Sequence, residues 1–117
     1  MEYVDGYILA VPEKNKESYQ AIAEMAAVVF KDHGALKVVE CWGDDVPEGK
    51  VTSFSMAVQR KPDEAVVFSW ITWPSKAARD SGMAAAMQDT RMKHDPSQMP
   101  FDGMRMIFGG FKVLVSA

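Results

Sequence analysis

Residues 65–73 constrain the fold more than any other segment, because both of their alternating faces are apolar. The run Ala-Val-Val-Phe-Ser-Trp-Ile-Thr-Trp consists almost entirely of β-branched and aromatic residues, which favour strands. Successive side chains of a strand point to opposite sides of the sheet. One side carries Val67, Ile71 and Trp73, and the other carries Val66, Phe68 and Trp70. The segment therefore predicts a central strand that is covered on both faces.

The N-terminal part of the chain predicts a strand, a helix and a second strand. Residues 3–11 and 35–42 are rich in β-forming residues, and Pro12 ends the first of these runs. Asn15 is the expected N-cap of the helix, and Gly34 is expected to take the left-handed conformation that closes it. One helix face carries the apolar side chains at three-and-four spacing, namely Tyr19, Ile22, Ala23, Ala26, Val29, Phe30 and His33.

The C-terminal part predicts a second helix and a last strand. Ser75 is the expected N-cap of the helix, which is expected to continue as far as Asp95-Pro96. Residues 104–115 are expected to form the last strand, with a bulge or bend at Gly109-Gly110. Residues 51–59 fit both a strand and a helical turn, and the pattern favours neither.

These elements predict a single α+β domain over residues 1–117. Their order, β-α-β-β-α-β, is typical of the ferredoxin-like arrangement, with an antiparallel sheet and both helices on one of its faces. The other face then stays bare, although the strands are apolar on both sides. Since a monomer would expose a large apolar patch, we expect a homodimer that packs sheet on sheet and encloses a cavity.

Composition and motifs narrow the functional classes. The 117 residues carry a formal charge of -3 without a block of Lys and Arg, so nucleic acid is not an expected partner. The apolar stretches are shorter than the ~20 residues of a membrane span, and the N-terminus lacks the pattern of a signal peptide, which predicts a cytoplasmic protein without a membrane partner. His33 and His94 lie far apart without a ligand spacing, and no phosphate- or dinucleotide-binding motif occurs, so neither a metal nor a cofactor is expected.

Four side chains are the candidates for ligand binding. Glu40 and Arg105 are both expected on strands, where a charge needs a partner or a ligand, and an arginine binds a carboxylate through two hydrogen bonds. An ion pair within the protein is the slightly favoured alternative. Tyr7 and Trp70 are expected beside the cavity at the sheet face, where aromatic walls suit an apolar or aromatic ligand, although dimer interfaces use tryptophan equally often.

Two side chains are candidates for acid or base catalysis. His33 ends the first predicted helix on its apolar face, from which it can reach a pocket, but a histidine also suits the negative end of a helix dipole. The capping role is the favoured interpretation. Tyr7 is the second candidate. Cys41 is expected to be a buried small hydrophobic residue, because nothing adjacent in the sequence lowers its pKa.

Several motifs resemble a known family. They are Tyr3-Val4-Asp5-Gly6-Tyr7, Asp32-His33-Gly34-Ala35-Leu36, Glu40-Cys41-Trp42-Gly43-Asp44-Asp45-Val46, Asp63-Glu64-Ala65-Val66-Val67-Phe68-Ser69-Trp70, Met99-Pro100-Phe101-Asp102-Gly103 and Arg105-Met106-Ile107-Phe108-Gly109-Gly110-Phe111. Together they span nearly the whole chain, which resembles the YbaA-like bacterial family of unknown function. That family is similar to the dimeric α/β-barrel group, and the resemblance implies a ferredoxin-like protomer and a homodimer. It implies no particular reaction, since one fold supports many chemistries.

Three functions follow as hypotheses. The first is a homodimer that binds a small apolar or aromatic molecule at the sheet face, with Tyr7, Glu40, Trp70 and Arg105 nearby. The second is a cofactor-free enzyme of the monooxygenase or isomerase type that uses His33 or Tyr7. The third is a structural or interaction dimer without a ligand, in which Glu40 and Arg105 pair only with protein.

Overall fold

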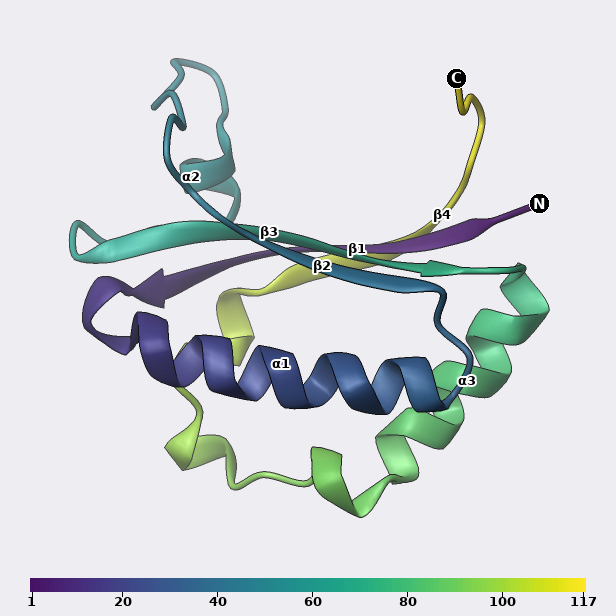
Figure 1. The fold of residues 1–117 in the computed structure, drawn as a ribbon. Coiled ribbons are helices and arrows are strands. Elements are labelled where there is room, and N and C mark those ends of the chain that lie inside the picture. The colour runs from purple at the N-terminus through teal and green to yellow at the C-terminus, as the bar shows by residue number, and fades with distance from the viewer.

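A four-stranded antiparallel sheet forms the centre of the protein, which we describe from a computed structural model covering residues 1–117 (Figure 1). The strands are β1 (Tyr3–Pro12), β2 (Lys37–Trp42), β3 (Glu64–Trp73) and β4 (Ile107–Lys112). They lie in the order β2-β3-β1-β4, and β1 pairs with β3 from end to end. The two-sided segment 65–73 is therefore a central strand, as its pattern predicted, while β2 and β4 form the edges.

The two long helices, α1 (Lys16–Asp32) and α3 (Lys76–Gln88), lie on the same side of the sheet (Figure 1). Gly34 has a φ of 109° just after α1, as expected for the residue that closes a helix. Asn15 occupies the N-cap position of α1, but its side chain does not cap the helix. Its Nδ2 atom instead donates a 3.0 Å hydrogen bond to the carbonyl oxygen of Pro100.

The segment between β2 and β3 contains only one helical turn, α2 (Phe54–Ala57). The Ser53 hydroxyl caps this turn by accepting a 3.0 Å hydrogen bond from the amide of Met56. This resolves the ambiguity of residues 51–59 in favour of the helix. In Figure 1 the turn lies on the side of the sheet opposite α1 and α3.

The second long helix is shorter than the sequence predicted. Ser75 caps it as expected, with the Ala78 amide donating to its hydroxyl at 3.1 Å, but α3 ends at Gln88. Asp89 has extended backbone angles and caps a separate 3₁₀ turn, Thr90–Met92. Because an aspartate favours the start of a turn over the interior of a helix, the helix stops well before Pro96.

The last strand also differs from the prediction, since β4 covers only Ile107–Lys112 and follows a 3₁₀ turn, Gly103–Arg105. Gly109 and Gly110 pair in regular register with Gly6 and Asp5, so they do not form a bulge. Close packing explains instead why residue 110 is a glycine. A Cβ atom there would overlap the Arg79 guanidinium and lie 2.6 Å from the Tyr3 hydroxyl oxygen.

The main core lies between the two helices and one end of the sheet. Trp73 is fully buried there and packs with Val29, Phe30 and Ala86. A second cluster at the other end of the same sheet face consists of Leu9, Val11, Tyr19 and Val67. The two clusters hold the helices against the sheet at its ends.

Gly82 in α3 is expected to be intolerant of a larger side chain. A Cβ atom there would overlap the carbonyl oxygen of His33 and the indole ring of Trp73. Although alanine favours helices more than glycine, we expect Gly82→Ala to lower the free energy of unfolding by about 1–3 kcal/mol because of overpacking. Urea denaturation measures this change. Gly103→Ala is the matched control, since its Cβ meets nothing within 4 Å, and it should stay within about 0.5 kcal/mol of wild type.

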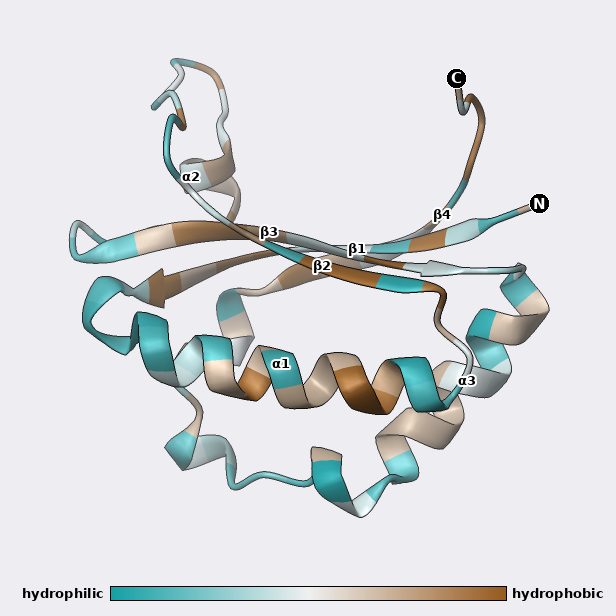
Figure 2. Cartoon of the chain, in the orientation of Figure 1, coloured by the Kyte–Doolittle hydropathy of each residue, from teal (hydrophilic) through white to brown (hydrophobic).

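The side of the sheet opposite the long helices is apolar and only partly covered, and we call it the open face. Phe68 and Phe111 on this face are 44% and 61% exposed. Figure 2 shows how the apolar stretches of the strands contrast with the polar loops. The strand registers and alternation place on the open face Val4, Ile8, Val39, Phe68, Trp70, Ile107 and Phe111. The two long helices therefore leave one apolar side of the sheet accessible, as the sequence predicted.

Candidate functional site

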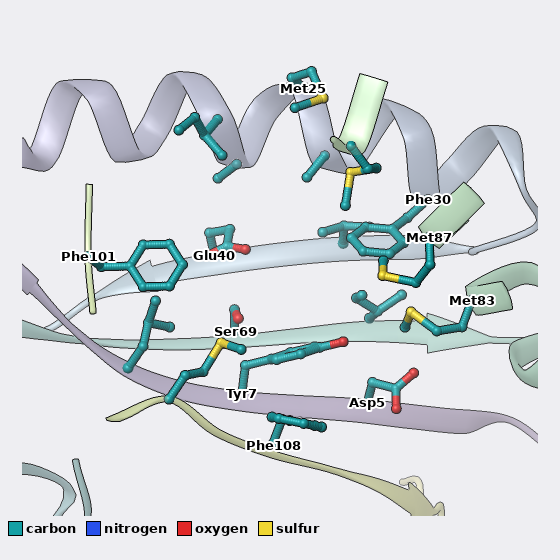
Figure 3. Close-up of a pocket in the computed structure, with 18 of the residues that line it drawn as sticks. Asp5, Tyr7, Met25, Phe30, Glu40, Ser69, Met83, Met87, Phe101 and Phe108 are labelled. Atoms are coloured by element: carbon teal, nitrogen blue, oxygen red, sulfur yellow. The ribbon is translucent and has the colours of Figure 1, made fainter. Parts of the chain in front are cut away.

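A cavity of about 580 Å³ lies between α1 and the helix-facing side of the sheet (Figure 3). Side chains of β1, β2, β3 and β4 line its floor, and α1 lies above them. Met83 and Met87 of α3 close one end, and Phe101 lies toward the other. Of the 24 residues that line the cavity, 17 are hydrophobic. Its volume and lining are typical of sites for small molecules.

Methionine is the most frequent residue type in the cavity wall. Six of the nine methionines of the chain line it, namely Met25, Met83, Met87, Met92, Met99 and Met106. A methionine side chain is unbranched and polarisable, so it adapts to ligands of different shape and contacts aromatic rings favourably. The wall therefore suits an apolar or aromatic ligand more than a strongly polar one.

One row of polar side chains crosses the cavity floor. Glu40 on β2 is paired with Ser69 on β3, Ser69 with Tyr7 on β1, and Tyr7 with Phe108 on β4. Because directly paired residues point to the same side of a sheet, all four face the cavity, and Figure 3 shows them along its floor. The Tyr7 and Phe108 rings stack with centroids 6.1 Å apart. The neighbouring row is formed by Leu9, Val67 and Trp42 and is apolar.

Glu40 is the acidic member of this row. Its Oε1 atom accepts a 2.5 Å hydrogen bond from the Tyr19 hydroxyl of α1. Glu40 is exposed on the edge strand β2, but partial desolvation by the apolar wall raises its pKa, while the Tyr19 hydrogen bond acts in the opposite direction. Desolvation also raises the pKa of Tyr7 to about 12, so the Tyr7 phenol is neutral at pH 7.

A second acidic group, Asp5, lies at the other end of the floor and is satisfied by protein. The indole Nε1 of Trp73 donates to its Oδ2 at 2.9 Å, and the Arg79 Nε lies 3.3 Å from its Oδ1. Burial is the main effect on Asp5 and raises its pKa, whereas the Trp73 hydrogen bond and the Arg79 charge lower it. The Arg79 guanidinium also lies 4.7 Å from the centre of the Tyr3 ring and donates to Asp80 at 2.9 Å.

The four residues expected to bind a ligand do not share one site. Tyr7 and Glu40 line the cavity, but Trp70 lies on the open face because it alternates with Ser69 and Ile71. This cavity lies on the helix-covered side of the sheet. The cavity expected at the other face, between the two sheets of a dimer, stays a prediction.

Arg105 is outside the cavity and is not on a strand. It belongs to a 3₁₀ turn and binds both carboxylate oxygens of Glu64, at 2.8 Å and 2.7 Å. The intramolecular ion pair that the sequence left as an alternative is thus present, but its partner is Glu64. Glu40 forms no ion pair, and its hydrogen-bond partner is the Tyr19 hydroxyl.

The histidines and the cysteine lie in three different environments. His33 is not part of the cavity wall, and its Nε2 atom lies 3.0 Å from Asp89 Oδ2, which Arg91 contacts at 2.7 Å. This network connects the end of α1 to the turn after α3, in line with a structural role. His94 is exposed at the cavity. Cys41 is exposed on the edge strand β2, so the prediction that it is buried is wrong.

Tyr19 is a residue of the site that the sequence indicates only as part of an apolar helix face. Asp5 and Ser69 are polar residues at strand positions that could line a cavity, but neither is among the four candidates for ligand binding. The strand register was the missing information, since it brings Ser69 between Glu40 and Tyr7.

A smaller cavity of about 320 Å³ lies between α1 and the β2 edge, and Tyr19 and Glu40 line both cavities. No helix of the structure is long and apolar enough to cross a membrane.

Comparison with known proteins places the chain among uncharacterised bacterial proteins. A family described as "Protein of unknown function (DUF1428)" matches residues 2–103. The uncharacterized protein YbaA of Escherichia coli strain K12 is 53% identical over 115 residues, which cover 98% of each chain. The uncharacterized protein YbaA of Shigella flexneri is similar to the same extent. The resemblance to YbaA-like proteins is thereby confirmed, and the chain belongs to the DUF1428 family of unknown function.

Proposed function

We propose that this protein binds a small, mainly apolar or aromatic molecule in the cavity between α1 and the sheet. The observation that carries this function is the cavity itself, which has about 580 Å³ of space and 17 hydrophobic residues among the 24 that line it. A few polar groups on an apolar wall are the usual composition of a binding site for a small molecule. The methionine-rich wall supports a ligand without a large polar surface.

A neutral fluorescent probe, N-phenyl-1-naphthylamine, tests this function directly. We expect its fluorescence to increase on saturable binding, because the cavity removes the probe from water. Ala26→Phe, which places a ring inside the cavity, should weaken binding at least about tenfold, corresponding to about 1.4 kcal/mol. Ala21→Phe is the matched control, since Ala21 is exposed on the same helix and lines neither described cavity. If the probe does not bind, or if both variants bind it like wild type, the proposed function is wrong.

The protein is also proposed to act as a homodimer built from ferredoxin-like protomers, in the manner of the dimeric α/β barrels. The strand order β2-β3-β1-β4 and the position of both long helices on one face support this protomer. The open face supports the dimer, because Phe68 and Phe111 expose large apolar surfaces that a second sheet can cover. Sedimentation equilibrium measures the oligomeric state, and a monomer at every concentration would contradict this part of the proposal.

An enzyme of the isomerase type is the second candidate function, and Glu40 is the observation that favours it. A carboxyl group whose pKa is raised in an apolar cavity is suited to act as a general base. In this role Glu40 accepts a proton from the bound molecule, and the Tyr7 phenol donates a hydrogen bond to the oxygen on which negative charge develops. His33 is a less suitable acid or base, because Asp89 holds it outside the cavity.

Proton exchange into a ligand distinguishes catalysis from binding. For a carbonyl compound that displaces the fluorescent probe, the enzymatic function predicts incorporation of deuterium from D₂O at the carbon next to the carbonyl group, measured by proton NMR. Glu40→Gln should abolish this exchange while the compound still binds. Binding without exchange in the wild-type protein would leave the binding function and exclude the isomerase reaction for that compound.

A further inference from the structure

The two carboxyl groups of the cavity are neutralised to different extents. Asp5 has a cation beside it, since the Arg79 Nε lies 3.3 Å from its Oδ1, and it accepts a hydrogen bond from Trp73. Arg79 is the only arginine or lysine in the cavity wall, and its terminal nitrogens donate to Asp80 and to the Tyr3 hydroxyl. Lys16 lines the smaller cavity with Glu40 and His94 lines the larger one, but neither of them forms an ion pair with Glu40.

Glu40 also retains unused capacity to accept hydrogen bonds. The Tyr19 hydroxyl donates to its Oε1 atom, and no other side chain bonds to this carboxylate. An ionised carboxylate has about four lone-pair sites, so most of them have no protein donor. A ligand that enters the cavity displaces water from this exposed carboxylate, so the ligand itself has to supply a donor or a positive charge that compensates for the lost hydration.

Two hydroxyl groups lie beside Glu40 in the row across the cavity floor. Ser69 follows it in the row across the floor, and Tyr7 follows Ser69. Neither hydroxyl has a hydrogen-bond partner among the side-chain contacts of the chain, and neither oxygen is sealed from the cavity. Ser69 is the smallest side chain of the row, which leaves space above it between the Glu40 carboxylate and the Tyr7 phenol.

From this arrangement, and resting on the binding function proposed above, we infer that the ligand carries a hydrogen-bond donor, either a hydroxyl or an ammonium group, which binds Glu40 at the row formed with Ser69 and Tyr7. The apolar or aromatic body of the ligand lies among the methionines of the wall. A carboxylate in place of the donor is rejected, because it would repel Glu40 and would find the only arginine of the wall already bound to Asp5 and Asp80.

Four naphthalene derivatives test the inference, because they share one body and differ in the head group. They are 2-naphthol, 2-naphthylmethylamine, 2-methoxynaphthalene and 2-naphthoic acid, each measured by displacement of N-phenyl-1-naphthylamine at pH 7. We expect the naphthol or the amine to bind at least about tenfold more tightly than the methoxy compound, because only a donor satisfies Glu40. Naphthoate is expected to bind most weakly.

Glu40→Gln is the decisive variant, since it keeps the shape of the side chain and removes its charge. We expect it to remove the advantage of the amine over the methoxy compound and to allow naphthoate to bind more tightly than it binds wild type. Glu17→Gln is the control, because Glu17 is exposed on α1 and lines neither cavity. This control should leave the affinity of every probe unchanged.

The possible results separate this inference from the function on which it rests. A preference for the amine identifies an ammonium group as the donor and a preference for the naphthol identifies a hydroxyl, and both support the inference. Equal affinity of all four compounds in wild type, or tightest binding of naphthoate, overturns it while leaving an apolar binding cavity. If the fluorescent probe itself does not bind, the proposed function has failed and not only the choice of head group.

Discussion

Replacing Arg105 by glutamine is expected to lower the free energy of unfolding by about 3–5 kcal/mol. Arg105 and Glu64 form a bidentate ion pair, and their side chains are only 13% and 4% exposed. Removal of the guanidinium leaves the Glu64 carboxylate buried without its cation, which costs more than the loss of an exposed pair. Urea denaturation of the wild-type and variant proteins measures this difference.

The same pair gives a pH dependence with a defined sign. Two hydrogen bonds from Arg105 are the main reason that the pKa of Glu64 falls from 4.5 to about 2. Since the folded protein holds the carboxylate in its charged form, the stabilisation is complete above pH 4.5 and is lost as the pH falls from about 4.5 to about 2. The Arg105→Gln variant should show a smaller loss of stability over this range than wild type.

Two further variants determine whether the pair itself is responsible. Lys76→Ala removes the exposed ion pair of Lys76 with Asp80 and should change the free energy of unfolding by no more than about 0.5 kcal/mol. A double variant, Arg105→Met with Glu64→Leu, removes both charges and should be more stable than Arg105→Gln, since it leaves no unpaired carboxylate. Equal stability of wild type and Arg105→Gln at pH 7 would contradict this account of the ion pair.

Placing a charge at Phe68 is expected to dissociate the proposed homodimer. Phe68 is 44% exposed on the open face, where its ring centre lies 5.5 Å from that of Trp70 and 6.1 Å from that of Phe54. In a two-fold dimer, each substitution occurs twice in the interface, so Phe68→Glu would bury two unpaired carboxylates. We expect the dissociation constant to rise at least about 100-fold, which corresponds to about 2.7 kcal/mol.

Sedimentation equilibrium of Phe68→Glu at several protein concentrations measures this effect, and circular dichroism verifies that the variant folds. Phe68 points away from the core between the helices and the sheet, so a folded monomer is the expected product. Ala21→Glu introduces the same charge on the outer side of α1 and should leave the dimer intact. A Phe68→Glu protein that dimerises as tightly as wild type would show that the open face is not the interface.

Local sequence patterns were sufficient to predict most of the secondary structure. The alternation in residues 65–73 located the central strand, and Ser75 and Gly34 marked the start of α3 and the end of α1. These signals depend on neighbouring residues, because capping bonds and side-chain alternation act within a few positions. The predicted end of α3 at Asp95-Pro96 lies too far along the chain, because Asp89 starts a new turn before Pro96.

The candidate site was only partly predictable for a different physical reason. Alternation identifies the residues that share a face of a strand, but it does not say which face the helices cover. Tyr7 and Glu40 line the cavity, while Trp70, which was expected beside them, lies on the other side of the sheet. The partner of Arg105, Glu64, lies 41 positions away in the sequence, and nothing local connects the two.

The sequence by itself determined the order of strands and helices, the two apolar sides of the central strand and the membership of an uncharacterised family. Only the tertiary structure decided which side of the sheet holds the cavity and which polar groups meet there. Strand register aligned Glu40, Ser69 and Tyr7 in one row, and chain packing placed the Tyr19 hydroxyl above the first of them. Such contacts between distant residues depend on how the elements pack, and packing buries apolar surface from several segments at once, so no single segment determines it.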